Sequence, residues 1–413
     1  MDVVIAGAGI GGLTAALALH RAGHRVRVFE AAAEIKELGL GINLQPHAVR
    51  ELDALGLMER VLAAGHPCVE WAVFNSFGQK IWVEPRGTRA GHDWPQISIH
   101  RGKLQGVLRD AVTERLGADA IETDRRLTGF TDSGARVTAR FAARDGGATE
   151  AAGDILIGAD GLHSTVRSLL YPGEGAPRYN GATLWRGMTR ARPFLSGGSQ
   201  TIAGRPDRKF IVYPVGAPDA DGMQPTNWLC ELRTPARPGG EEWNRAGRAE
   251  DLLPLYRDWR FDWLDVPALI AGTETIYEFP MMDREPVPRW SFGRVTLLGD
   301  AAHPMVPIGA NGGSQAIRDA TAIADALATE ADAPRALAAY DRARGPATAA
   351  LVRANRQFVL DEVMQIAHER APNGFADIAA VLSREEMEDV ARRYQQSVTW
   401  AKREGAAEGS VGV

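Results

Sequence analysis

The sequence has little cysteine, no long unbroken apolar run and no basic tract. Cys68 and Cys230 are too few for a disulfide framework and form no CxxC pair, which argues against disulfide-redox and zinc-ribbon proteins. The longest uncharged stretch, residues 3–19, is interrupted by glycines, is too short to span a bilayer and follows no basic segment. The 47 basic and 52 acidic residues give a net charge of −5, which disfavours nucleic acid as a partner. We therefore expect a cytoplasmic protein with neither a membrane nor a nucleic-acid partner.

Glycine, in contrast, is abundant, with 45 of 413 residues. The excess is clustered at residues 7–12, 39–41 and 309–313, which indicates close backbone approaches rather than low complexity. A chain of this length predicts two or three domains, or one large discontinuous domain.

The first 30 residues have the pattern of a complete βαβ unit. A predicted strand at 2–6 leads into Gly7-Ala8-Gly9-Ile10-Gly11-Gly12, a helix follows over 13–22, and a second strand spans 25–30. In this motif Gly7 permits the tight turn, Gly9 leaves room for a pyrophosphate, and Gly12 lets helix and strand pack closely. Glu30 can accept both hydroxyls of an adenosine ribose. The pattern predicts a dinucleotide site without distinguishing NAD from FAD.

The remaining chain alternates between α/β and strand-rich segments. Short strands are predicted at 69–74 and 79–84, a helix at 101–116, and buried strands at 154–160 and 294–298. The region 176–289 is rich in strands and turns, residues from 334 onward are helical, and the tail 404–413 is expected to be disordered. We predict a nucleotide-binding domain of residues 1–68, 98–175 and 290–345. An antiparallel β domain of residues 69–97 and 176–289 interrupts it, and helices and a tail occupy 346–413.

Two further motifs follow the buried strands. Asp160-Gly161 is followed by Arg167, and Gly299-Asp300 is followed by Pro304 and then by the glycine-rich segment Pro307–Gly313. Asp300 stands at the carboxyl end of a predicted parallel strand, where α/β sheets bind ligands. The segment before the next helix offers bare backbone N–H groups, which favour negative charge.

Together, the GxGxxG loop with Glu30, the Asp-Gly motif and the Gly-Asp motif resemble the class A flavoprotein monooxygenases, the p-hydroxybenzoate hydroxylase family. The order and spacing match over about residues 1–360. Residues 40–46, 98–105 and 296–303 resemble phenazine-carboxylate monooxygenases of that family, with salicylate hydroxylases the next nearest group. The resemblance implies an α/β fold: a Rossmann-like FAD-binding domain (the p-hydroxybenzoate hydroxylase fold), an inserted antiparallel β-sheet substrate domain and C-terminal helices.

The resemblance also implies a reaction and its reagents. NADH or NADPH would visit transiently to reduce noncovalent FAD, O2 would form a flavin C4a-hydroperoxide, and an aromatic or heteroaromatic carboxylate would be hydroxylated, with or without decarboxylation. The enzyme would be a monomer or a homodimer. Positions that the family pattern assigns to the cofactor are Gly7, Gly9, Ile10, Gly11, Gly12, Glu30, Gly41, Arg101, Gln105, Leu127, Asp160, Arg167, Asp300, Pro307, Gly309, Asn311, Gly312 and Gly313.

Several of these residues also have plain structural interpretations. Arg101 could be a solvated arginine at a helix start, although the helix dipole disfavours a cation there. Asp160 and Arg167 could form an ion pair that only fastens a loop. His303 is expected to pack under the Gly-Asp motif rather than to act as a base.

The β domain should form the floor of the substrate pocket. Trp185, Arg186 and Tyr213 are the candidate catalytic residues, with Trp228, Met305 and Pro307 as further pocket candidates. Arg186 could pair with a substrate carboxylate or be an exposed strand residue. Tyr213 could bond a phenol or carboxylate, or be an ordinary sheet tyrosine with a buried partner.

Other functions leave part of the pattern unexplained. A flavin-free Rossmann dehydrogenase does not need the Gly-Asp motif, and a non-catalytic flavin-binding protein does not need the segment 307–313. A monooxygenase that acts on a nonaromatic enol, or that epoxidises a polyketide-like substrate, would carry the same motifs.

Overall fold

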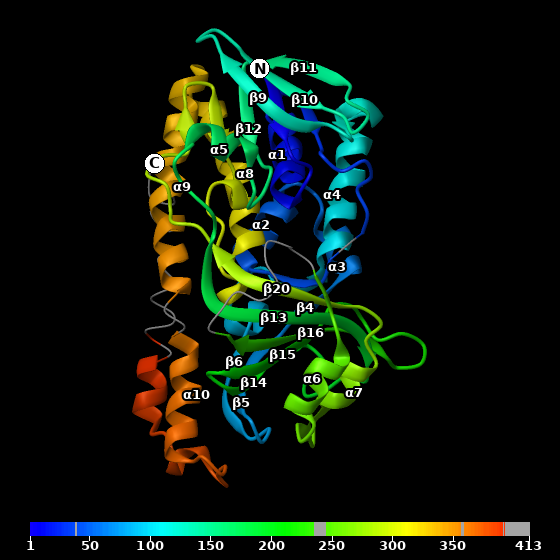
Figure 1. The fold of residues 1–413 in the computed structure, drawn as a ribbon, viewed down its shortest axis with the longest axis vertical. Coiled ribbons are helices and arrows are strands. Elements are labelled where there is room, and N and C mark those ends of the chain that lie inside the picture. Colours follow the sequence, from blue (N-terminus) through cyan, green and yellow to red (C-terminus); the bar gives the residue numbers. More distant parts are fainter. Residues whose placement is uncertain (38, 235–244, 357–358, 391, 393–413) are drawn as a thin grey trace.

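The computed structural model describes residues 1–413 except 38, 235–244, 357–358, 391 and 393–413. The tail 404–413, expected to be disordered, lies outside the described residues. The elements form a parallel sheet with helices at one end of the molecule and a larger, mostly antiparallel sheet at the other (Figure 1).

The first sheet is built on β1, whose apolar residues are buried on both faces. Its neighbours β2 and β12 pair with it in parallel, β22 extends the parallel set, and β21 adds an antiparallel edge. The near-continuous apolar sequences of β1 and β12 reflect this two-sided burial. In spatial order the strands are β21 (Ser291–Phe292), β22 (Val295–Leu297), β12 (Ile155–Gly158), β1 (Asp2–Ala6), β2 (Arg25–Phe29) and β8 (Ile121–Glu122).

Helices pack around this sheet and share its core. The most extensive helix contacts join α1 to α8 and to α4, and α8 to α9. The helices are α1 (Ile10–Arg21), α2 (Pro46–Ala54), α3 (Met58–Ala64), α4 (Arg101–Leu116), α5 (Thr165–Leu170), α8 (Gly312–Thr329) and α9 (Ala333–Asn355). A separate antiparallel sheet, which the sequence analysis did not anticipate, consists of β9 (Arg126–Asp132), β10 (Val137–Ala142) and β11 (Ala148–Gly153).

The large sheet has eight strands and buries both faces. One face packs on a cluster of aromatic and aliphatic residues beneath α6 (Ala249–Tyr256) and α7 (Val266–Ala271). At one edge, the other face is covered by α10 (Val359–Arg370). In spatial order the strands are β17 (Arg245–Gly247), β20 (Ile276–Asp283), β13 (Arg178–Ala191), β16 (Gln224–Arg233), β15 (Arg208–Pro214), β14 (Ser199–Arg205), β5 (Glu70–Asn75) and β6 (Lys80–Pro85). The pair β14–β5 is parallel, so the sheet is mixed rather than wholly antiparallel. A small hairpin, β18 (Arg260–Phe261) and β19 (Leu264–Asp265), lies beside α7.

A further sheet, of three strands, joins the two halves. β7 (Gln96–His100) pairs with β3 (Gly41–Leu44) and with β4 (Gly65–Cys68), both antiparallel. The expected boundary between residues 97 and 98 therefore falls inside a strand. Gly41, the last residue of the glycine cluster at 39–41, begins β3. None of the helices in the described part of the chain is long and apolar enough to cross a membrane.

Candidate active site

The glycine-rich loop between β1 and α1 has the backbone geometry that its sequence predicts. Gly7 has a φ of +108°, and a Cβ at Gly12 would lie 2.0 Å from the Gly7 carbonyl oxygen, so only glycine allows this helix–strand contact. A Cβ at Gly9 would meet nothing within 4 Å, which leaves open space in front of the helix. The first turn of α1 carries no acidic residue and its cap residue Gly9 has no side chain. The helix N-terminus can therefore receive an anion such as a pyrophosphate.

Glu30 lies at the end of β2 beside this loop. Its Oε2 accepts a hydrogen bond from the backbone N–H of Ala8 (2.8 Å) and its Oε1 accepts one from Ala32 (2.8 Å). Gln105 of α4 donates from Nε2 to the Ala8 carbonyl at 2.7 Å. Glu30, Gln105 and Leu127 line a cavity of about 370 Å³ together with Gly7 and Gly9. A carboxylate has about four acceptor positions, so Glu30 keeps capacity for ligand hydroxyls.

Asp160 and Arg167 do not form a pair. Asp160 lines the Glu30 cavity and caps the start of α5, accepting hydrogen bonds from the Ser164 hydroxyl and from the backbone N–H of Thr165 (2.7 Å). The capping Ser164 in turn accepts from the backbone N–H of Arg167 at 2.9 Å. The pKa of Asp160 is raised because burial outweighs these hydrogen bonds.

Arg167 faces away from both cavities, so a direct cofactor contact for it is wrong. Its side chain is 2% exposed, and its Nε donates to Glu174 at 2.8 Å. Its Nη1 donates to the carbonyls of Ala301 (3.0 Å) and Ala302 (2.7 Å). A buried guanidinium needs several acceptors, and here they come from the backbone after Asp300. Arg167 therefore stabilises the backbone that follows the Gly-Asp motif.

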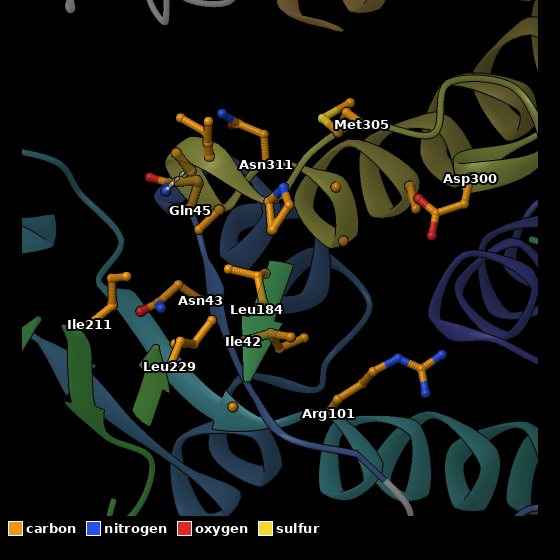
Figure 2. Close-up of a pocket in the computed structure, with 18 of the residues that line it drawn as sticks. Ile42, Asn43, Gln45, Arg101, Leu184, Ile211, Leu229, Asp300, Met305 and Asn311 are labelled. Atoms are coloured by element: carbon orange, nitrogen blue, oxygen red, sulfur yellow. Dashed lines mark hydrogen bonds between the residues drawn. The ribbon is translucent and has the colours of Figure 1, made fainter. Parts of the chain in front are cut away.

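The Gly-Asp motif and the segment before α8 line a second, main cavity of about 420 Å³. Its lining includes every residue of this region that the family pattern assigns to the cofactor: Asp300, Pro307, Gly309, Asn311, Gly312 and Gly313. The first turn of α8 carries no acidic residue, and the buried Asn311 Nδ2 has no hydrogen-bond partner among the described residues. Gly309 adopts a φ of +70° and its carbonyl accepts from Gln45 Nε2 at 3.1 Å. Figure 2 shows Asn311, Met305 and Asp300 along this side of the cavity.

A buried polar network supports this loop from below. Asp319 of α8 accepts from the Gly299 N–H (3.1 Å), from Arg344 Nε (2.8 Å) and bonds His303 Nε2 at 2.5 Å. Burial alone would raise the pKa of Asp319, but His303 and Arg344 lower it to about 2. His303 also packs beside Trp290, with ring centroids 5.3 Å apart. The expectation that His303 packs under the motif is confirmed.

On the opposite side, the large sheet forms the floor of the main cavity, and only alternate residues face it. In β13, Leu184 and Arg186 line the cavity, whereas Trp185 packs into the aromatic cluster under α6 and α7. The same holds in β16, where Leu229 lines the cavity and Trp228 is buried on the other face, bonding Thr273 through Nε1 (2.8 Å). The prediction that Trp185 and Trp228 belong to the pocket is wrong, because successive strand residues point to opposite faces. In Figure 2, Leu184, Ile211 and Leu229 form the apolar floor.

Arg186 and Tyr213 both face the cavity and both bond the same carbonyl. Arg186 Nη2 and the Tyr213 hydroxyl each donate to the Gly41 oxygen at 2.7 Å. Asn227 Oδ1 accepts from the Gly41 N–H at 2.7 Å, so both backbone polar groups of Gly41 are bonded to the large sheet. A Cβ at Gly41 would lie 2.6 Å from the Asn227 Cβ, which requires glycine here. Burial lowers the pKa of Arg186, and it raises the pKa of Tyr213, whose hydroxyl therefore keeps its proton at neutral pH.

The cavity also contains an ionic cluster that the sequence analysis missed. Lys209 of β15, Glu231 of β16 and Asp361 of α10 all line it, and Lys209 Nζ lies 2.7 Å from Glu231 Oε1 and from Asp361. A lysine inside an apolar strand sequence, Lys209-Phe-Ile-Val-Tyr213, is the signal that could have indicated a buried charge. The partner from α10 lies 152 residues away, and no local pattern indicates it.

These features fit FAD. The two cavities share Gly9, Arg101, Ala159 and Gly161 in their linings, so an extended dinucleotide can pass from Glu30 to the α8 N-terminus. Two uncapped helix N-termini, α1 and α8, meet the cavity where a pyrophosphate and an electron-rich flavin ring need positive potential. Arg101, at the start of α4, lines both cavities, and Figure 2 shows its side chain extending from that helix.

Comparisons with known proteins agree with this interpretation. The family model described as FAD binding domain matches residues 1–355. The phenazine 1,6-dicarboxylic acid hydroxylase PhzS of Lysobacter antibioticus is 46% identical over 92% of this chain and 95% of that protein. The 3-hydroxybenzoate 6-hydroxylase 1 of Aquipseudomonas alcaligenes is 33% identical over 84% of this chain and 86% of that protein. The structure is similar to that of Klebsiella pneumoniae HpxO complexed with FAD and uric acid, with a TM-score of 0.74, 28% identity, and coverage of 86% and 87% of the two chains. The chain therefore belongs to the FAD-binding-domain family and is an FAD-dependent monooxygenase of the p-hydroxybenzoate hydroxylase fold.

Proposed function

We propose that the enzyme uses NAD(P)H and O2 to hydroxylate a phenazine-like aromatic carboxylate, with or without decarboxylation. The observation that carries the proposal is the main cavity, in which Leu184, Ile211 and Leu229 face the loop before α8. These residues make an apolar floor, and the lining around it includes Arg186, Tyr213 and Lys209, so the cavity suits an aromatic ring that carries an acidic group. The 46% identity to a phenazine dicarboxylic acid hydroxylase supports the same substrate class.

The cofactor would be held by the residues around both cavities. The α1 N-terminus with Ile10 and Gly11 would hold the pyrophosphate, Glu30 the ribose, and the backbone of Leu127 would face the adenine. Arg101 would contact ribityl or phosphate oxygens and Asp300 the ribityl hydroxyls, while the Gly312 and Gly313 N–H groups would face the pyrimidine ring of the flavin. FAD, when bound, supplies the redox chemistry that activates O2.

The chain's own contribution is positioning, charge stabilisation and exclusion of water. The positive end of α8 favours negative charge on a reduced ring. The aliphatic floor keeps water from the reacting ring. Tyr213 and Arg186 fix the Gly41 peptide at the edge of the cavity, so that the cofactor side and the substrate side keep one relative position. We assign the cofactor to residues 1–68, 98–175 and 290–345 and the substrate to 69–97 and 176–289, with a contribution from α10.

We further propose that the enzyme works as a monomer or homodimer in the reducing cytoplasm. Both cysteines are free and buried, which suits a compartment where thiols stay reduced. Light scattering after size-exclusion chromatography measures the oligomeric state.

The proposed activity is tested by substrate-stimulated NAD(P)H oxidation over a panel of phenazine carboxylates, hydroxybenzoates and nonaromatic enols, with product mass measured in parallel. We expect phenazine carboxylates to stimulate oxidation most and to gain one oxygen atom. Stimulation by the enols alone would contradict the substrate class. Tight FAD binding with no stimulation by any compound would favour a non-catalytic flavin protein.

A further inference from the structure

The floor of the main cavity has a polar end, an apolar middle and an ionic end. Along β15 the cavity-facing residues are Tyr213, Ile211 and Lys209. Their cross-strand partners in β16 are, in the same order, Asn227, Leu229 and Glu231. Each pair forms one level of the floor, so the three levels are polar, apolar and ionic. At about 3.3 Å per residue, the ionic level lies about 13 Å along the strand from the polar level. Tyr213 bonds Gly41 at the cofactor side, so Lys209 lies at the end away from it.

At the ionic end, two carboxylates share Lys209. Glu231 faces Lys209 from the neighbouring strand, and its position is fixed by the ladder between β15 and β16. Asp361 comes from a different element, α10, and both of its carboxylate oxygens lie 2.7 Å from Lys209 Nζ. Burial and the nearby Glu231 raise the pKa of Asp361, although Lys209 acts in the opposite direction. Burial therefore disfavours the charged form of Asp361.

Asp361 also has a second cation within reach. Arg233 lies two residues after Glu231 on the same face of β16, and its Nη2 lies 3.4 Å from Asp361 Oδ2. The Arg233 side chain is 34% exposed, whereas that of Lys209 is 2% exposed. A small rotation of the Asp361 side chain toward Arg233 would keep it paired and better hydrated. Lys209 would then have one carboxylate position open toward the cavity.

We propose that a carboxylate at the far edge of the substrate replaces Asp361 on Lys209, and that Asp361 moves to Arg233. This inference rests on the proposed function and narrows its substrate class: a fused aromatic whose acidic group lies opposite the ring that is oxidised. The exchange leaves the charge around Lys209 unchanged, so burying the substrate carboxylate does not add an unpaired ion. The distance between the two ends exceeds the length of a single ring with its carboxylate, which disfavours hydroxybenzoates.

The test measures binding to the FAD-loaded enzyme by flavin absorbance changes, with phenazine-1,6-dicarboxylate, phenazine-1-carboxylate and phenazine as probes. In the unmodified enzyme we expect the dicarboxylate to bind at least tenfold more tightly than phenazine. Asp361→Asn removes the competing anion, so dicarboxylate affinity should rise three- to tenfold while phenazine affinity stays the same. Lys209→Met should abolish the discrimination. Lys80→Met is the matched control, because it removes an exposed lysine from the same sheet and should change neither affinity.

Arg233 supplies a test of the exchange itself. Arg233→Gln should weaken dicarboxylate binding in the otherwise unmodified enzyme, since Asp361 loses its second partner, but should have no effect in the Asp361→Asn background. If Lys209→Met does not fold, the Asp361 and Arg233 variants decide the question. Equal or weaker dicarboxylate binding in Asp361→Asn overturns the inference, as does an Arg233 effect that persists in that background. The proposed function fails separately, when no aromatic carboxylate stimulates NAD(P)H oxidation in the unmodified enzyme.

Discussion

Replacing Glu30 by alanine tests the proposed ribose site most directly. The carboxylate holds two backbone N–H groups, those of Ala8 and Ala32, each at 2.8 Å, and keeps acceptor positions for the ribose hydroxyls. Hydrogen bonds to a charged group contribute about 1.5–3 kcal/mol each, so losing one or two ribose bonds should weaken FAD binding by one to two decades or more. The loop contacts matter less, because water entering the cavity can hydrate the two freed N–H groups. We therefore expect the apoprotein to lose only about 1–3 kcal/mol of unfolding free energy.

The assay is fluorescence titration of FAD into the apoprotein, with chemical denaturation in parallel. Glu34→Ala is the matched control: Glu34 lines the same cavity, but its side chain is 71% exposed and its nearest cation, Lys36, is 3.5 Å away. It should change FAD affinity less than twofold. Unchanged FAD affinity in Glu30→Ala would mean that the ribose lies elsewhere. Equal losses of FAD affinity in Glu30→Ala and Glu34→Ala would mean that the effect comes from the change in net charge and not from a ribose contact.

Three further outcomes follow from the site. Tyr213→Phe should retain FAD and NAD(P)H oxidation, because Arg186 still holds the Gly41 carbonyl. It should divert oxygen into hydrogen peroxide, because a substrate ring that has lost its contact with Tyr213 is misplaced, and about 1 Å of displacement of the ring can lower the rate of hydroxylation roughly a hundredfold. Peroxide and product measured per NAD(P)H consumed test this, and wild-type coupling would leave Tyr213 a structural residue. Asp319→Asn should lower the unfolding free energy by about 2–3 kcal/mol at pH 7. The pKa of Asp319 falls from 3.8 to about 2 in the folded state, so its stabilisation is complete above about pH 4 and disappears as the pH falls through 2. Denaturation curves at pH 7, 4 and 2 check this, and a loss that does not depend on pH would contradict it. Acid precipitation should release all the flavin, because neither a cysteine nor a histidine is among the residues that line the main cavity, and colour in the pellet would refute noncovalent binding.

The cofactor side was predictable from the sequence because its signals are local. Gly7 adopts a positive φ, Gly12 contacts the Gly7 carbonyl within the same βαβ unit, and Glu30 follows at the end of the next strand. Local sequence patterns likewise predicted the positions of Asp300 and of the uncapped start of α8. Backbone geometry of this kind requires particular residue types at particular spacings.

The substrate side was less predictable because its strands are buried on both faces. In such a strand both alternating sets are apolar, so the sequence around Trp185 cannot indicate which set faces the cavity. Choosing between them requires knowing that α6 and α7 cover one face. The partners of Arg167 and of Lys209 arise from tertiary contacts, the second across 152 residues.

The Gly41 peptide has a consequence for how such enzymes change substrate. The N–H and the carbonyl of Gly41 are bonded by three residues of the large sheet, so the main chain on both sides of this residue joins the two halves. No side chain at position 41 takes part in these hydrogen bonds, so a substitution there offers no way to adjust them. Leu184, Ile211 and Leu229 take no part in these hydrogen bonds, whereas a change of Arg186, Tyr213 or Asn227 removes one of them. The residues that shape the substrate pocket can therefore change without altering the contacts that align the two halves.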